Sequence, residues 1–98
     1  MSHFVYELIP PRPTFDSDMT EAEAATMGEH AGYWSELLAN RVAVVFGPVA
    51  DPAGTSGLAV VEADAEADVH ALGKRDPALT SGIATFEVCA MPMAIVRS

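Results

Sequence analysis

The spacing of hydrophobic residues changes along the chain, and these changes predict six secondary-structure elements. Runs rich in β-branched and aromatic residues predict four strands, at residues 3–9, 42–47, 57–63 and 83–91. Two stretches with helical spacing of apolar residues predict helices at 21–40 and 65–74. Segments rich in Pro, Asp and Gly, at 10–18 and 48–56, are predicted to be loops. The predicted order is β-α-β-β-α-β.

Polar residues mark where the predicted helices begin. Thr20 and Glu23 form the pattern of a capping box, in which each side chain satisfies a free backbone amide of the other. Asp64 is expected to cap the second long helix. Asp76 directly precedes Pro77, the usual pair at the start of a short helix, here at 77–81.

This element order predicts an α+β fold of the ferredoxin-like type. Two right-handed β-α-β units give a four-stranded antiparallel sheet with both helices on one face. The second and third strands, however, are apolar on both faces, as 42–46 and 58–61 carry no charge. Because the helices cover only one face, a second copy is the simplest cover for the other. We therefore expect a homodimer, the dimeric α+β barrel.

Length and composition favour a single soluble domain spanning residues 1–98. No apolar run approaches the ~20 residues of a membrane-spanning helix, and the first residues do not resemble a secretory signal. Cys89 is the only cysteine, which excludes an internal disulfide and fits a reducing compartment. We therefore expect a cytoplasmic protein.

The net charge of −9 bears on the partners of the protein. A nucleic-acid binder needs clustered Lys and Arg to displace phosphate counterions, and the sequence has no such cluster. Nucleic acids and anionic membranes are therefore not expected partners.

His30 is the first candidate for chemistry. A helical projection of 21–40 places it in the apolar stripe with Met27, Trp34 and Leu38, next to Tyr33, so the imidazole faces the sheet. A buried neutral histidine bonded to a backbone carbonyl is the alternative. Asp76 is the second candidate, although a carboxylate that only caps 77–81 explains it equally, and the two roles are compatible.

Other residues give weaker signals. Tyr6, Trp34 and Phe86 are candidates to line an apolar ligand pocket, with plain core packing as the alternative. Arg12 is a candidate to hold an anionic substrate at the pocket mouth, unless it is simply solvated. Cys89 is expected in the core, and no metal site is expected because the histidines lack ligand spacing. Neither a serine nucleophile nor a phosphate-binding glycine loop is recognisable.

The ordered set of motifs resembles the YCII-related family. These motifs are Glu-His-x-x-Tyr-Trp-x-x-Leu at 29–37, Gly-Pro-x-Ala-Asp-Pro-x-Gly at 47–54, and Asp-Pro at 76–77 ahead of Phe-Glu-Val at 86–88. The Asp-Gly-Pro-Phe signature of the longer family branch is absent. The resemblance implies a dimeric α+β barrel with a His/Asp pair in a pocket between helix and sheet. On the matching positions the pair is His30 and Asp76.

The resemblance implies a small cofactor-independent enzyme that carries out elimination or isomerisation of a small cyclic or aromatic compound. In this hypothesis His30 transfers the proton and Asp76 fixes its tautomer. A non-catalytic ligand-binding or accessory homodimer is the main alternative. A cofactor-free oxygenase is a third possibility, which depends on fold analogy alone.

Overall fold

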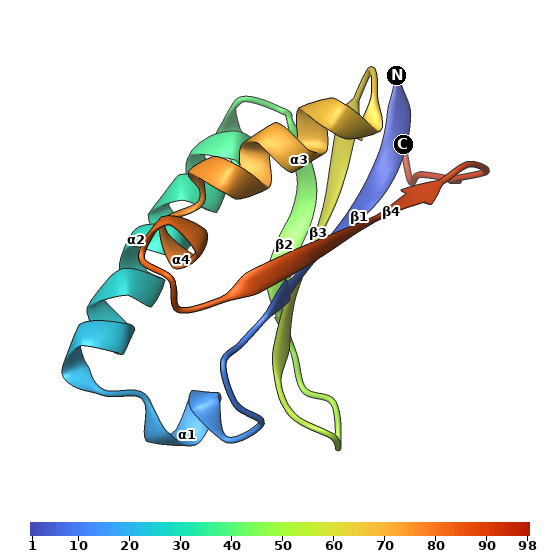
Figure 1. Cartoon of the computed structure of the whole chain (residues 1–98). Coiled ribbons are helices and arrows are strands. Elements are labelled where there is room, and N and C mark those ends of the chain that lie inside the picture. Colours follow the sequence, from blue (N-terminus) through green and yellow to red (C-terminus); the bar gives the residue numbers. More distant parts are fainter.

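The computed structural model describes residues 1–98 and contains one four-stranded antiparallel sheet (Figure 1). Strand β1 (Ser2–Ile9) is central and pairs with β3 (Ser56–Ala63) on one side and β4 (Thr85–Met91) on the other. Strand β2 (Ala43–Val49) forms the edge beyond β3, which gives the order β2-β3-β1-β4. The predicted ferredoxin-like α+β fold is therefore confirmed.

The helices lie on one face of this sheet (Figure 1). The long helix α2 (Glu21–Ala39) begins with the predicted capping box, in which the Thr20 hydroxyl accepts from the Glu23 amide and Glu23 accepts from the Thr20 amide. Helix α3 (Glu66–Arg75) and the short α4 (Pro77–Thr80) follow β3. These helices bring residues distant in sequence onto the same face of β1.

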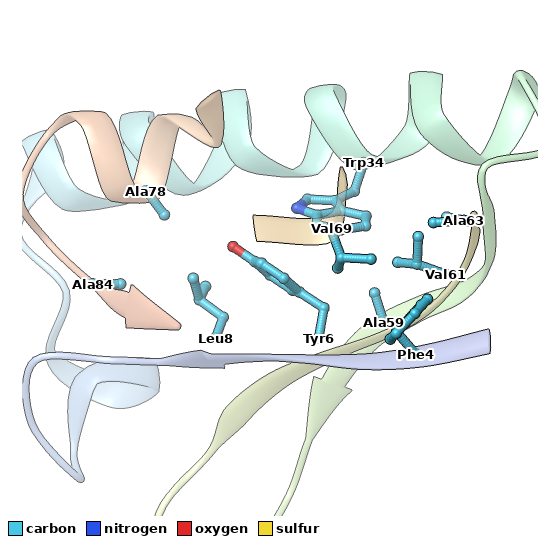
Figure 2. Close-up of a cluster of buried hydrophobic side chains, with 11 residues drawn as sticks. Phe4, Tyr6, Leu8, Trp34, Ala59, Val61, Ala63, Val69, Ala78 and Ala84 are labelled. Atoms are coloured by element: carbon cyan, nitrogen blue, oxygen red, sulfur yellow. The ribbon is translucent and has the colours of Figure 1, made fainter. Parts of the chain in front are cut away.

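The core lies between α2, α3 and the inner face of the sheet. Residues alternate along β1, so Phe4, Tyr6 and Leu8 point toward the helices, as Figure 2 shows. Trp34 descends from α2 to meet them and is only 1% exposed. Val61 and Val69 complete the centre of this cluster.

The buried stripe of α2 is narrower than the sequence predicts. Met27, His30, Trp34 and Leu37 face the sheet, whereas Leu38 remains 42% exposed. The side of the stripe that carries His30, Tyr33 and Leu37 packs against the sheet, so Leu38, on the other side of Trp34, is left in solvent. The expected burial of Leu38 is therefore wrong.

The outer face of the sheet carries apolar side chains that no element covers. The strand register places Val5, Val45 and Val60 side by side there, and Val45 is 53% exposed. Cys89 lies opposite Val5 on the same face and is exposed, so its expected core position is wrong. Because side chains alternate along a strand, an apolar sequence alone does not tell which face a residue occupies.

Local differences from the predicted boundaries have simple causes. The predicted loop at 10–18 contains the short helix α1 (Phe15–Asp18), which buries Phe15. Asp64 does not cap α3, whose first turn follows Ala65 without a side-chain cap. Strand β2 continues through Pro48, because an edge strand tolerates a residue that lacks an amide hydrogen.

Candidate active site

His30 and Asp76 meet in the space between α2 and α4. The imidazole Nδ1 lies 2.9 Å from Oδ1 and 2.9 Å from Oδ2 of Asp76, although 46 residues separate them in sequence. The Asp76 side chain is completely buried, and that of His30 is 15% exposed. The imidazole therefore lies between the carboxylate and the solvent-accessible side of the site.

Asp76 is held by donors from three elements besides His30. Its Oδ2 accepts from the Trp34 indole at 2.8 Å and the Tyr6 hydroxyl at 3.0 Å. Its Oδ1 accepts from the Ala78 amide at 2.9 Å, which makes it the cap of α4 as well. The same carboxylate thus caps α4 and contacts His30. A fully buried carboxylate is tolerated when its oxygens are satisfied in this way.

These contacts keep Asp76 ionised. Burial alone would raise the pKa of the Asp76 carboxyl, but the hydrogen bonds from His30, Trp34 and the Ala78 amide and the charge of His30 together lower it. Burial and the neighbouring Asp76 charge and hydrogen bond raise the pKa of the Tyr6 hydroxyl, which therefore stays protonated as a donor.

The ionised carboxylate fixes the proton on the imidazole. A carboxylate only accepts, so Nδ1 of His30 must carry the hydrogen that points to Asp76. In the neutral ring Nε2 is then the unprotonated nitrogen, and it makes no hydrogen bond with the protein. This arrangement leaves a base with a free lone pair.

A cavity of about 260 Å³ opens beside His30. The sheet, α1, the middle of α2 and the loop between β2 and β3 form its walls, which are mostly apolar. Lining residues include Tyr6, Leu8, Phe15, Met19, Met27, His30, Trp34, Phe46, Pro48, Thr55, Ser56 and Leu58. The volume is close to the lower limit of about 300 Å³ for typical ligand pockets, so it fits a small molecule.

Two of the predicted pocket aromatics line this cavity, and one does not. Tyr6 and Trp34 contribute to the wall while their polar atoms point to Asp76. Phe86 is absent from the wall and stacks on Tyr6 from behind, with the ring centroids 5.2 Å apart. Phe86 thus supports the wall without forming part of it.

Arg12 lies outside the cavity and is engaged with acidic side chains. Its Nε donates to Asp18 at 2.7 Å, and its terminal nitrogens donate to Glu23 at 2.7 and 3.0 Å. The hydrogen bonds from Arg12 and the Thr20 amide lower the pKa of Glu23 to about 2. The guanidinium also lies 5.3 Å from the Phe15 ring centroid, so Arg12 fastens α1 to the start of α2.

Much of the cavity wall was not identified from the sequence. Met27 lies three residues before His30, so the helical projection already places them on one face. Phe15, Phe46 and the loop around Thr55 carry no comparable signal, because only the folded chain brings them to α2.

No three His, Cys, Asp or Glu side chains converge as metal ligands would. None of the helices combines the length and the apolar character that a membrane-spanning segment requires.

The fold and the site together define a small ferredoxin-like α+β protein with a His/Asp pair beside an apolar cavity. The chain belongs to the YCII-related domain family, whose pattern matches residues 4–92.

Comparison with solved structures supports the same fold. The chain is similar to 5-chloro-2-hydroxyhydroquinone dehydrochlorinase from Burkholderia phenoliruptrix, solved as a complex with 2,5-dihydroxybenzoquinone. The TM-score is 0.61 at 19% sequence identity, over 87% of this chain and 89% of that chain. No curated protein matches the chain in sequence.

Proposed function

We propose that this chain is a small cofactor-independent enzyme in which His30 transfers a proton and Asp76 orients it. The observation that supports this proposal best is the contact of Nδ1 with both oxygens of a buried, ionised Asp76. It leaves Nε2 as the group that faces a ligand in the cavity. A base so positioned is a recurrent source of catalysis, typically ~10²–10⁴-fold.

Elimination or isomerisation is the chemistry that fits this pair. In elimination, Nε2 takes a proton from the substrate, and the electrons of the broken bond form a new double bond while the leaving group departs with its own bonding pair. In isomerisation, the imidazolium returns the proton to another atom of the substrate. Neither reaction changes the oxidation state of the enzyme, and the Asp76 charge stabilises the imidazolium in both.

The cavity wall favours a small cyclic or aromatic substrate. The rings of Tyr6, Trp34 and Phe46 offer flat apolar surfaces, and Leu8 adds an aliphatic side chain to the wall. The structurally similar dehydrochlorinase was solved with a dihydroxylated quinone, a ligand of this shape. Hydroxylated aromatic rings of this shape, such as hydroxyquinols, also carry phenol groups whose protons His30 could take.

We also propose that the active form is a homodimer. The uncovered outer face of the sheet presents Val45, Val49 and Met91, which are between 38% and 53% exposed. A second copy packed on this face would bury them, and such a face is costly to leave in water.

The proposal is tested by turnover of 5-chloro-2-hydroxyhydroquinone and of related chlorinated and unchlorinated hydroxyquinols, followed by chloride release and ultraviolet absorbance. Wild-type protein is compared with His30→Gln, and with Glu29→Gln as a control on the exposed side of the same helix. Turnover that falls at least ~100-fold only in His30→Gln is expected. Binding of these compounds without any His30-dependent turnover would favour the non-catalytic ligand-binding homodimer.

A further inference from the structure

We infer that the cavity selects an uncharged ligand and that the Asp16 carboxylate disfavours anions there. The inference depends on the proposed function in one respect only, that the cavity beside His30 is the ligand site. It concerns the charge of the ligand and not the reaction. It also replaces the expectation that Arg12 holds an anionic substrate.

No Lys or Arg side chain is placed to meet an anion in the cavity. The chain has five Lys and Arg residues, and none of them lines the wall. Arg12 is the nearest in sequence to the wall residues, but its guanidinium nitrogens are engaged with Asp18 and Glu23. A ligand carboxylate or phosphate would therefore lose water without gaining a Lys or Arg partner, which is unfavourable in apolar surroundings.

The one acidic side chain on the wall is Asp16, in α1. It is exposed and makes no hydrogen bond or ion pair with another residue. The backbone at Asp16 is nevertheless held in place, because the neighbouring Phe15 is buried and Arg12 ties Asp18 of the same helix to Glu23. The negative charge thus stays at the cavity, in a chain whose net charge is already −9.

Uncharged polar groups, in contrast, find partners. Nε2 of His30 accepts from a ligand hydroxyl, and the side chain of Thr55, which also lines the cavity, makes no hydrogen bond within the protein. A compact ring with hydroxyl or carbonyl substituents satisfies these groups and the apolar wall together. The inferred ligand class is a neutral, hydroxylated ring compound.

A matched pair of probes tests the inference, namely 4-hydroxybenzamide and 4-hydroxybenzoate at pH 7. They share shape and phenol group and differ in the charge of one substituent. Trp34 is the only tryptophan and lines the cavity, so its indole N–H gives a single NMR signal that reports binding. We expect the amide to shift this signal with a dissociation constant at least ~10-fold lower than that of the carboxylate.

Two variants measure the part of this discrimination that comes from Asp16. Asp16→Asn should improve binding of the carboxylate about threefold and leave the amide unchanged, as expected for one exposed charge at short range. The control Glu36→Gln removes an equal charge from an exposed position outside the wall and should change neither affinity by as much.

Several outcomes would overturn the inference. They are equal or tighter binding of the carboxylate, an Asp16→Asn effect no larger than that of Glu36→Gln, or no shift of the indole signal by either probe at 10 mM. The first two leave His30-dependent turnover untouched. Conversely, a preference for the amide without any turnover would retain the ligand class and reject only the proposed reaction.

Discussion

The indole Nε1 of Trp34 donates to Oδ2 of Asp76 at 2.8 Å, so a side chain of the cavity wall also holds the carboxylate behind the candidate base. Tyr6 does the same from the opposite side of the core. His30 and Trp34 are four residues apart on α2 and therefore share one helix face. A single helix thus supplies both the base and one donor that fixes its partner.

Removing the Tyr6 hydroxyl should cost more stability than removing the Tyr33 hydroxyl. Tyr6 donates to the charged Asp76, whereas Tyr33 donates to the neutral carbonyl of Leu72. Tyr6→Phe should therefore lower the free energy of unfolding by ~1.5–3 kcal/mol, and Tyr33→Phe by ~0.5–1.5 kcal/mol. Urea denaturation of both variants measures the difference. Equal losses would mean that the Asp76 contact adds nothing to an ordinary hydrogen bond.

The sequence was sufficient to identify the fold and the central pair. The capping box at Thr20 and the apolar strands reflect local chemistry, so their positions are readable from neighbouring residues. His30 was noticeable because an ionisable group fell on an apolar helix face. Its pairing with Asp76 followed from the family resemblance, since no local rule joins residues 46 positions apart.

The roles of the other candidate site residues depend on tertiary contacts, which the sequence does not show. Trp34 and Tyr6 were expected to meet a ligand, and nothing local shows that their polar atoms reach a buried carboxylate. Arg12 looked free in the sequence because Asp18 and Glu23 approach it only after the chain turns at α1. Phe86 was a reasonable pocket residue by type, but its strand position places it behind Tyr6.

Acid should destabilise the fold in two separable parts. Folding lowers the pKa of the buried Asp76 and of the two Arg12 partners, Asp18 and Glu23, that of Glu23 to about 2. Each therefore contributes stability above its ordinary pKa near 4. That stability is lost as the pH falls from about 4.5 toward 2, because the unfolded chain binds protons first. The free energy of unfolding, measured in urea at each pH, should decline over this window.

Salt and one variant separate the two contributions. The exposed Arg12–Glu23 pair is screened by added salt, whereas the buried Asp76 contacts are not. Glu23→Gln keeps an acceptor for the capping box but removes the charge, so it should flatten only part of the decline. A Glu23→Gln protein whose stability is independent of pH between 5 and 2 would contradict the assigned role of Asp76.

A charge on the outer sheet face should dissociate the proposed dimer. Val45 is 53% exposed on that face, so Val45→Lys is compatible with a folded single chain but not with a second copy packed against it. Sedimentation equilibrium at micromolar concentration should show a wild-type dimer and a monomeric variant. Leu38→Lys, an exposed apolar site on α2, serves as the control and should remain dimeric. A monomeric wild-type protein would reject the dimer.

Gly73 should be intolerant of even a methyl group, because it lies against the ring that supports Tyr6. A Cβ at this position of α3 would lie 2.6 Å from ring atoms of Phe86, well inside van der Waals contact. Gly73→Ala therefore forces Phe86 away from its stack on Tyr6. Overpacking of this kind costs ~1–3 kcal/mol, which outweighs the ~0.5–1 kcal/mol that alanine gains in a helix.

Gly28 provides the matched control for this substitution. It lies within α2, and a Cβ there would meet no atom within 4 Å, so Gly28→Ala should stabilise the protein by ~0.5–1 kcal/mol. Adding Phe86→Leu to Gly73→Ala shortens the obstructing side chain and should recover part of the loss. Urea denaturation of the single and double variants gives the coupling free energy, expected at ~1 kcal/mol or more for residues in direct contact. If Gly73→Ala stabilised the protein as Gly28→Ala does, the close approach of α3 to Phe86 would be wrong, and with it the support of Tyr6 behind the cavity wall.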